Sequence, residues 1–201
     1  MQSLEEKIVR DGLALGTQIV KVDSFLNHQI DVAFLHEIGD EFARLFADRQ
    51  PTKILTMESS GIACAIAAAQ SLGDLPVVFA KKTVPSTMVE DIWYADVKSF
   101  TKGTVSRAVV ARKFLHAGDR VLIIDDFLAH GEAGMGMIEI CRQAGAEVVG
   151  MGAVIEKEFQ GGGARIREAL GEEARLHSLA VISQIRDGVI SFRHLEQEVP
   201  L

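Results

Sequence analysis

The stretch VLIIDDFLAHGEA, residues 121–133, contains the features that decide the fold. Its first four residues are apolar and do not alternate with polar ones, which predicts a strand buried on both faces. Asp125 and Asp126 follow, and a short glycine-containing loop leads into a helix. In a parallel sheet, ligands bind beyond the carboxyl ends of the strands, and the N–H groups at a helix start suit a phosphate. The alternative is a plain strand that ends in solvated acidic residues.

Further apolar runs on both sides of this stretch predict the rest of the sheet. Strands that alternate with helices are typical of a parallel sheet covered by helices. Near the end of the sequence, Asp187-Gly188 between two apolar runs predicts a hairpin. The predicted strands are residues 53–57, 76–80, 121–124 and 148–155, and the predicted helices are residues 30–47, 62–72 and 132–144, the last closed by Gly145. We therefore expect an α/β fold in one domain, residues 1–201, with a mostly parallel sheet flanked by helices.

Composition excludes several classes of protein. The 201 residues are 48% hydrophobic and 24% charged, which argues against a disordered, collagen-like or coiled-coil chain. The net charge of −7 argues against a nucleic-acid or membrane-surface binder. Two cysteines, Cys64 and Cys141, are too few for a disulfide framework and are expected in the core. No apolar run approaches 18 residues and residues 1–7 do not resemble a secretory signal, so we expect a cytoplasmic protein.

Residues 121–133 resemble the signature of the type I phosphoribosyltransferases, in which four apolar, two acidic and two apolar residues precede a loop of small residues. The resemblance implies that Asp125 and Asp126 are the catalytic pair and face the ribose hydroxyls of phosphoribosyl pyrophosphate (PRPP). It also implies that the next loop binds the PRPP 5′-phosphate. Two of its positions, His130 and Ala133, hold residues where the family often has threonine. The loop comprises Ala129, His130, Gly131, Glu132 and Ala133.

The resemblance extends over most of the chain and is closest to the members of the family that use xanthine. The matching segments are residues 15–31, 58–63, 99–102, 121–133 and 155–159, in this order. The resemblance implies conversion of xanthine and PRPP to xanthosine 5′-monophosphate and pyrophosphate by a homodimer, with Mg²⁺ bridging PRPP oxygens. It also implies a hood over the sheet edge from about residues 1–50 and 156–201.

Two other polar segments follow predicted strands. Ser59, Ser60 and Gly61 can cradle an anion with hydroxyl and N–H groups, and an N-capping turn is an equal alternative from the residues alone. The resemblance makes this segment the pyrophosphate loop. Lys81 and Lys82 can meet the charge that develops on departing pyrophosphate, whereas the alternative is a solvated pair. The resemblance implies that such a pair contacts PRPP, sometimes from the neighbouring subunit.

The residues expected around the purine lie near both ends of the chain. The Lys157 ammonium only donates, so it suits a 6-oxopurine carbonyl and opposes the amino group of adenine. Phe159 offers a ring for stacking. The resemblance places Asn27, which would read the 2-oxo group, and a backbone group near Val20 in the same pocket. The alternatives are a strand-end charge for Lys157, a core ring for Phe159 and a turn residue for Asn27. Residues 160–163 are expected to form a flexible turn.

The insertion at residues 83–106 surrounds a strand-like segment at 92–97 and predicts a hairpin or a mobile lid. A lid would exclude water from an oxocarbenium-like transition state. The alternative is a rigid extension of the sheet, pinned by Trp93-Tyr94. The six histidines are not spaced as metal ligands.

Two other functions compete with xanthine transfer. The nearer is transfer to guanine or hypoxanthine, because one asparagine is the only residue expected to read the 2-oxo group. The other is a non-catalytic PRPP-sensing regulator. The negative charge, and the lack of a winged-helix pattern in the first 30 residues, argue against the regulator.

Overall fold

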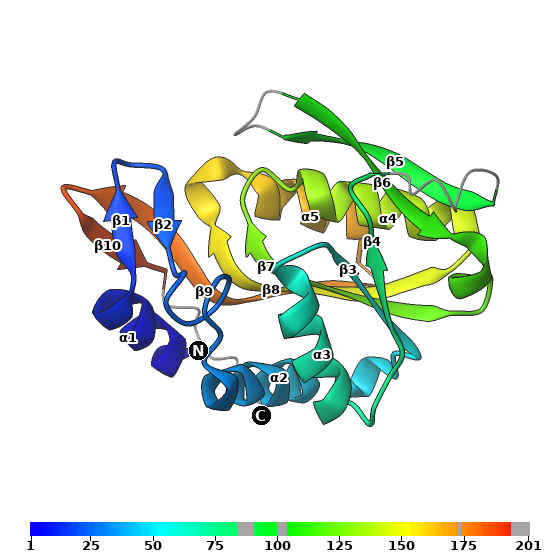
Figure 1. Cartoon of the computed structure of the whole chain (residues 1–201), viewed down its shortest axis with the longest axis horizontal. Coiled ribbons are helices and arrows are strands. Elements are labelled where there is room, and N and C mark those ends of the chain that lie inside the picture. The colour runs from blue at the N-terminus through cyan, green and yellow to red at the C-terminus, as the bar shows by residue number, and fades with distance from the viewer. Residues whose placement is uncertain (84–90, 100–103, 173, 194–201) are drawn as a thin grey trace.

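A six-stranded sheet runs through the middle of the computed structural model (Figure 1). The structure describes residues 1–83, 91–99, 104–172 and 174–193. The strand order is β10-β9-β8-β7-β3-β4, and every neighbouring pair is parallel except β10 with β9. The strands are β3 (Lys53–Met57), β4 (Val77–Ala80), β7 (Arg120–Leu128), β8 (Glu147–Lys157), β9 (Arg175–Arg186) and β10 (Val189–Phe192). The α/β fold with a mostly parallel sheet is confirmed.

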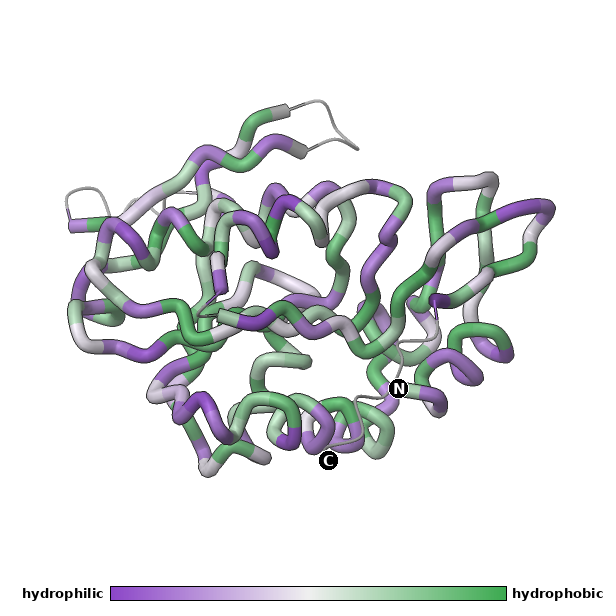
Figure 2. Tube along the Cα trace, turned by 180° about the vertical axis from the view of Figure 1, so that it is seen from behind, coloured by the Kyte–Doolittle hydropathy of each residue, from purple (hydrophilic) through white to green (hydrophobic). Residues whose placement is uncertain are grey.

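Helices cover both faces of this sheet (Figure 1). On one face lie α2 (Val32–Phe46) and α3 (Gly61–Ser71), and on the other lie α4 (Glu132–Ala144) and α5 (Gly162–Leu170). The central strands are apolar on both faces, so each face forms its own hydrophobic cluster. In Figure 2 much of the trace along the strands in the middle of the molecule has the green colour of hydrophobic residues. The three predicted helices are confirmed, and Gly145 ends α4 in the left-handed region, with φ of 68°.

A separate two-stranded sheet, β5 (Ile92–Ser99) with β6 (Thr104–Ala111), lies over α4. Its base is attached to the main sheet by an antiparallel bridge between Lys81 and Val109. The Trp93 indole N–H donates to the Leu115 carbonyl at 3.0 Å, so the base is held by Trp93 as the rigid alternative expects. The hairpin is confirmed.

Most of the polar parts of the predicted lid, residues 84–87 and 100–103, lie outside the described residues. Lid movement therefore stays a prediction.

The N-terminal segment forms elements that the sequence reading did not predict. They are α1 (Gln2–Asp11), β1 (Leu13–Leu15) and β2 (Ile19–Lys21), with β1 and β2 paired antiparallel. Leu4 and Ile8, one turn apart, are fully buried, and the N-terminal amine donates to the Leu179 carbonyl of β9. This segment therefore packs at the β9–β10 end of the sheet (Figure 1). Short 3₁₀ helices occur at Ala47–Arg49, Arg112–Phe114 and Glu158–Gln160.

Candidate active site

The direction in which successive strands are added to the sheet reverses between β3 and β7. From β3 the chain passes through α3 to β4 on one side, and from β7 it passes through α4 and α5 to β8 and β9 on the other. Such a switch point opens a crevice at the carboxyl ends of the two strands, where ligands bind in α/β proteins. The segments predicted to bind substrate follow β8, β7, β3 and β4, which are adjacent in this order. Tertiary structure therefore brings all four to one edge of the sheet.

The two acidic residues lie inside β7, near its carboxyl end, and not after the strand. The strand continues to Leu128, four residues beyond the predicted end. The side chains of Asp125 and Asp126 are nearly buried, with 6% and 7% of their residue surface exposed. The Asp126 N–H donates to Asp125 Oδ1 at 3.0 Å, and the Asn27 amide Nδ2 donates to Asp126 Oδ2 at 3.4 Å. The two adjacent carboxylates are thus buried and hydrogen-bonded near the carboxyl end of β7.

The electrostatics of this pair favour a positive partner. Burial, and then the neighbouring Asp126 carboxylate, raise the pKa of Asp125 well above its ordinary value. Lys82 acts in the opposite direction and lowers it, so its charge acts on the acid pair. An incoming cation or a sugar that gains positive charge would relieve the repulsion between the two acids.

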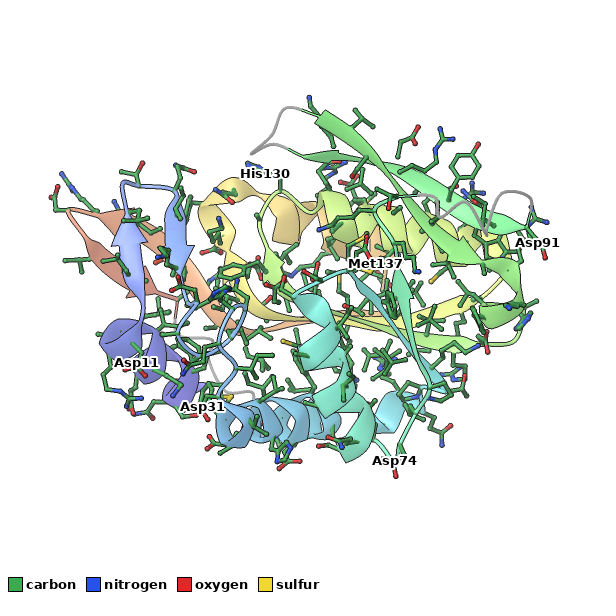
Figure 3. All side chains as sticks on the ribbon, in the orientation of Figure 1. Asp11, Asp31, Asp74, Asp91, His130 and Met137 are labelled. Atoms are coloured by element: carbon green, nitrogen blue, oxygen red, sulfur yellow. The ribbon has the colours of Figure 1, made fainter. Side chains whose placement is uncertain are left out.

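The loop after β7 is shorter than expected. Only residues 129–131 connect the strand to α4, and Glu132 and Ala133 belong to the first turn of this helix. Gly131 precedes the helix with φ of 81°, a conformation that side chains rarely tolerate, and no described side chain caps the helix start. His130, labelled in Figure 3, lies in this loop. The uncapped N–H groups and the helix dipole make this a suitable place for a phosphate.

The expected flexible turn at residues 160–163 is wrong. Gly162 and Gly163 are buried and begin α5. The Gly162 N–H donates to the Ala129 carbonyl at 3.0 Å, and the His130 Nδ1 lies 3.2 Å from the Gln160 carbonyl. The glycines allow the start of α5 to pack directly against the loop after β7, so this segment supports the loop from behind.

The sequence reading missed Arg165, which extends this support. Arg165 Nη1 donates to the His130 carbonyl at 3.2 Å and forms an ion pair with the Glu132 carboxylate. Thirty-three residues separate Arg165 from Glu132, so no local pattern in the sequence indicates the contact.

The segment after β3 lies beside the acid pair. Ser59 and Ser60 precede Gly61, which begins α3, and the Glu58–Ser59 peptide bond is cis. Ser60 occupies the N-cap position, but its side chain makes no capping hydrogen bond among the described residues. A Cβ atom at Gly61 would lie 2.9 Å from Asp125 Oδ1, so the start of α3 directly adjoins the carboxylates.

The two lysines after β4 differ in their surroundings. Lys81 pairs with β6 through its backbone, and its ammonium lies 5.9 Å from the centre of the Phe79 ring. Lys82 is exposed, and its backbone N–H donates to Glu58 Oε1 at 2.5 Å. Glu58, not singled out from the sequence, thereby ties the two segments that follow β3 and β4. Together with its effect on the Asp125 pKa, this contact puts Lys82 at the same edge.

The predicted purine residues lie at the carboxyl end of β8 and in the N-terminal segment. Lys157 ends β8, where burial lowers its pKa, and its Nζ donates to the Gln18 carbonyl at 3.1 Å. Phe159 is 36% exposed in the 3₁₀ helix that follows and is not a core ring. Val20 is buried in β2, two residues from Gln18, whereas Asn27 contacts Asp126. The N-terminal segment therefore reaches both Lys157 and the acid pair.

Other chemistries find little support in the part of the chain that the structure describes. It contains no group of three or more histidine, cysteine, aspartate or glutamate side chains that could hold a metal ion. Cys64 and Cys141 are buried thiols in the core, and burial raises the pKa of Cys141 to about 12. No helix among the described residues is long and apolar enough to cross a membrane.

Known proteins with similar sequences are phosphoribosyltransferases. The phosphoribosyl transferase domain family matches residues 23–164. A xanthine phosphoribosyltransferase of Lactobacillus acidophilus is 48% identical over 192 residues, which cover 96% of this chain and 98% of the relative. One from Geobacillus thermodenitrificans is 50% identical over 192 residues, which cover 96% and 97% of the two chains. The chain belongs to the xanthine phosphoribosyltransferase family. The family expected from residues 121–133 is thereby confirmed.

Solved structures of other phosphoribosyltransferases share the fold. The crystal structure of adenine phosphoribosyltransferase from Rhodothermus marinus has a TM-score of 0.70 and 21% identity to this member of the xanthine phosphoribosyltransferase family. It covers 90% of this chain and 100% of its own. At this identity the likeness concerns the fold alone, so the purine must be argued from side chains.

Proposed function

We propose that this protein transfers the phosphoribosyl group of PRPP to xanthine, giving xanthosine 5′-monophosphate and pyrophosphate. The order of the predicted subsites along the sheet edge carries the proposal. Lys157 ends β8, the acid pair lies near the end of β7 and the phosphate loop follows it, Ser59–Gly61 follows β3, and the lysines follow β4. This is the order purine, ribose phosphate and pyrophosphate in the reacting molecules. The names of the closely similar relatives support xanthine as the purine.

Each subsite has a proposed role in the reaction. A bond forms between purine nitrogen N9 and ribose carbon C1′ while the bond from C1′ to pyrophosphate oxygen breaks, with inversion at C1′. The purine proton passes to solvent. Asp125 and Asp126 stabilise the positive charge that develops on the ribose, and Lys82 with Lys81 stabilises the departing pyrophosphate. Uncapped N–H groups at the start of α4 hold the 5′-phosphate in position.

The purine is selected by hydrogen-bond matching. The Lys157 ammonium donates to the 6-oxo group of the purine. If adenine were bound instead, the ammonium and the adenine amino group would face each other as two donors without an acceptor. Phe159 stacks on the purine, and Asn27 with the backbone near Val20 reads the 2-oxo group. Asn27 donates to Asp126 in this structure, so in our proposal its amide also faces the ribose side of the pocket.

The residues present fit a magnesium ion that arrives with the substrate. Mg²⁺ is commonly held by one or two carboxylates together with substrate phosphates. Asp125 and Asp126 supply two adjacent oxygen donors, and no third described acid completes a site made by the protein alone. When bound, the ion would neutralise pyrophosphate charge.

Several features of the wider assembly also remain proposals. We propose a cytoplasmic homodimer whose chain forms one domain, with residues 1–50 and 156–201 as a hood and residues 83–106 as a lid. Light scattering coupled to gel filtration tests the dimer.

A three-purine assay tests the function. Purified protein with PRPP and Mg²⁺ is supplied with xanthine, guanine or hypoxanthine, and pyrophosphate release is measured. We expect xanthine to have the highest kcat/KM. A guanine preference of about tenfold or more would contradict the substrate, and no release with any purine would favour the PRPP-sensing regulator.

A further inference from the structure

A carboxylate lies at the start of α4, at the proposed phosphate site. Glu132 lies in the first turn of α4, whose N–H groups are proposed to hold the dianionic 5′-phosphate. A negative side chain beside a phosphate would weaken binding through like-charge repulsion. The Glu132 side chain is only 22% exposed, so solvent does not fully screen its charge. The first turn of α4 therefore needs a compensating positive charge.

Arg165 of α5 supplies this charge. Its Nη1 contacts Glu132 Oε1, and the same nitrogen donates to the His130 carbonyl at 3.2 Å. The second contact draws a loop carbonyl, a group that would also repel phosphate, toward α5. One guanidinium thus compensates the acidic side chain and holds the backbone oxygen.

We propose that Arg165 is a positioning residue for PRPP, which acts by neutralising Glu132 and orienting the His130 peptide. This inference rests on the proposed function, since it assumes that the loop binds the 5′-phosphate. Arg165 itself does not contact the substrate in this proposal. Its effect is expected in the affinity for PRPP and not in the chemical step, because the charge acts on bound substrate and transition state alike.

The pair differs from ordinary surface ion pairs of this protein. Glu139 and Arg142 form a comparable pair within α4, three residues apart, with the Arg142 side chain 74% exposed. Arg165 is instead contributed by another helix and contacts the loop backbone as well. The Glu139–Arg142 pair is therefore a matched control for loss of a surface guanidinium.

The test compares Arg165→Gln, Glu132→Gln, the double variant and Arg142→Gln under saturating xanthine and Mg²⁺. One charge within about a Debye length of a dianion is worth roughly a factor of ten in affinity. We expect Arg165→Gln to raise the KM for PRPP roughly tenfold, with kcat within about threefold of wild type. Glu132→Gln leaves the guanidinium uncompensated and should lower this KM, and adding it to Arg165→Gln should recover most of the loss. Added salt should reduce the Arg165→Gln defect.

The outcomes separate the two proposals. No PRPP-dependent turnover by the wild-type protein would refute the proposed function itself. With an active wild type, an unchanged KM in Arg165→Gln would overturn the inference. A double variant as impaired as Arg165→Gln would overturn it too, because the effect would then not come from the Glu132 charge. If Arg165→Gln fails to fold, Glu132→Gln alone decides: a KM for PRPP below the wild-type value supports the inference, and a KM at or above that value overturns it.

Discussion

Replacing Gly162 with alanine tests whether α5 sets the shape of the phosphate loop. A Cβ atom at this position would lie 2.3 Å from the Ala129 carbonyl oxygen and 2.6 Å from the Gly131 nitrogen. Ordinary contacts of this kind begin at 3.4 Å. Both neighbours are backbone atoms, so no side chain can rotate away. The start of α5 and the loop must separate by about 1 Å, which is the difference between 3.4 and 2.3 Å.

This displacement allows the size of the effect to be estimated. Overpacking in a close contact costs about 1–3 kcal/mol of stability. Misplacing a binding group by about 1 Å lowers catalysis by roughly a hundredfold. We expect Gly162→Ala to fold with a lowered melting temperature and to lose roughly a hundredfold in kcat/KM for PRPP.

Steady-state pyrophosphate release at varied PRPP, together with thermal melting, measures both effects. Ala164→Ser is the control, because residue 164 is exposed two positions further along the same helix. It should behave as wild type in both measurements. A folded Gly162→Ala with kcat/KM within twofold of wild type would refute the argument that α5 positions the loop.

Three further variants test the acid pair and the purine pocket. Asp126→Asn should lower kcat by about a hundredfold or more while leaving the melting temperature near wild type, and near-normal turnover would contradict its catalytic role. Asp125→Asn should stabilise the metal-free protein at neutral pH. The raised pKa of Asp125 means that its contribution to stability is fully present below about pH 3.8 and is lost as pH rises through the folded-state pKa. Its melting-temperature gain should therefore grow as pH rises above about 3.8, and a gain independent of pH would contradict the buried-charge argument. Lys157→Gln should raise the KM for xanthine by about 10- to 100-fold, the cost of a charged hydrogen bond, and an unchanged KM would remove Lys157 from the pocket.

The order of strands and helices was readable from the sequence because its causes are local. Uninterrupted apolar runs predicted β3, β4, β7 and β8. Helical periodicity predicted α2, a segment of small apolar residues between two strands predicted α3, and a segment closed by Gly145 predicted α4. Asp187 and Gly188, with φ of 51° and 78°, form the expected turn of the final hairpin. The N-terminal strands of three residues each were missed, since so short a segment cannot display alternation. Leu4 and Ile8, four residues apart, were an available signal for α1.

The family and the proposed acid pair were also readable from the sequence, because two carboxylates after an apolar run form a contiguous pattern. Tertiary structure alone decided what surrounds them. Asn27 reaches Asp126 across 99 residues of chain, and Arg165 reaches Glu132 across 33. Strand β7 continues past the acids because its last residues pair with β8. The apolar run at residues 121–124 does not indicate this pairing. Likewise the glycines at 162 and 163 resembled a flexible turn, since the backbone that packs against Gly162 lies some thirty positions earlier in the chain. Close packing between distant segments leaves no periodic trace in a sequence, and it becomes visible only when the sheet brings those segments together.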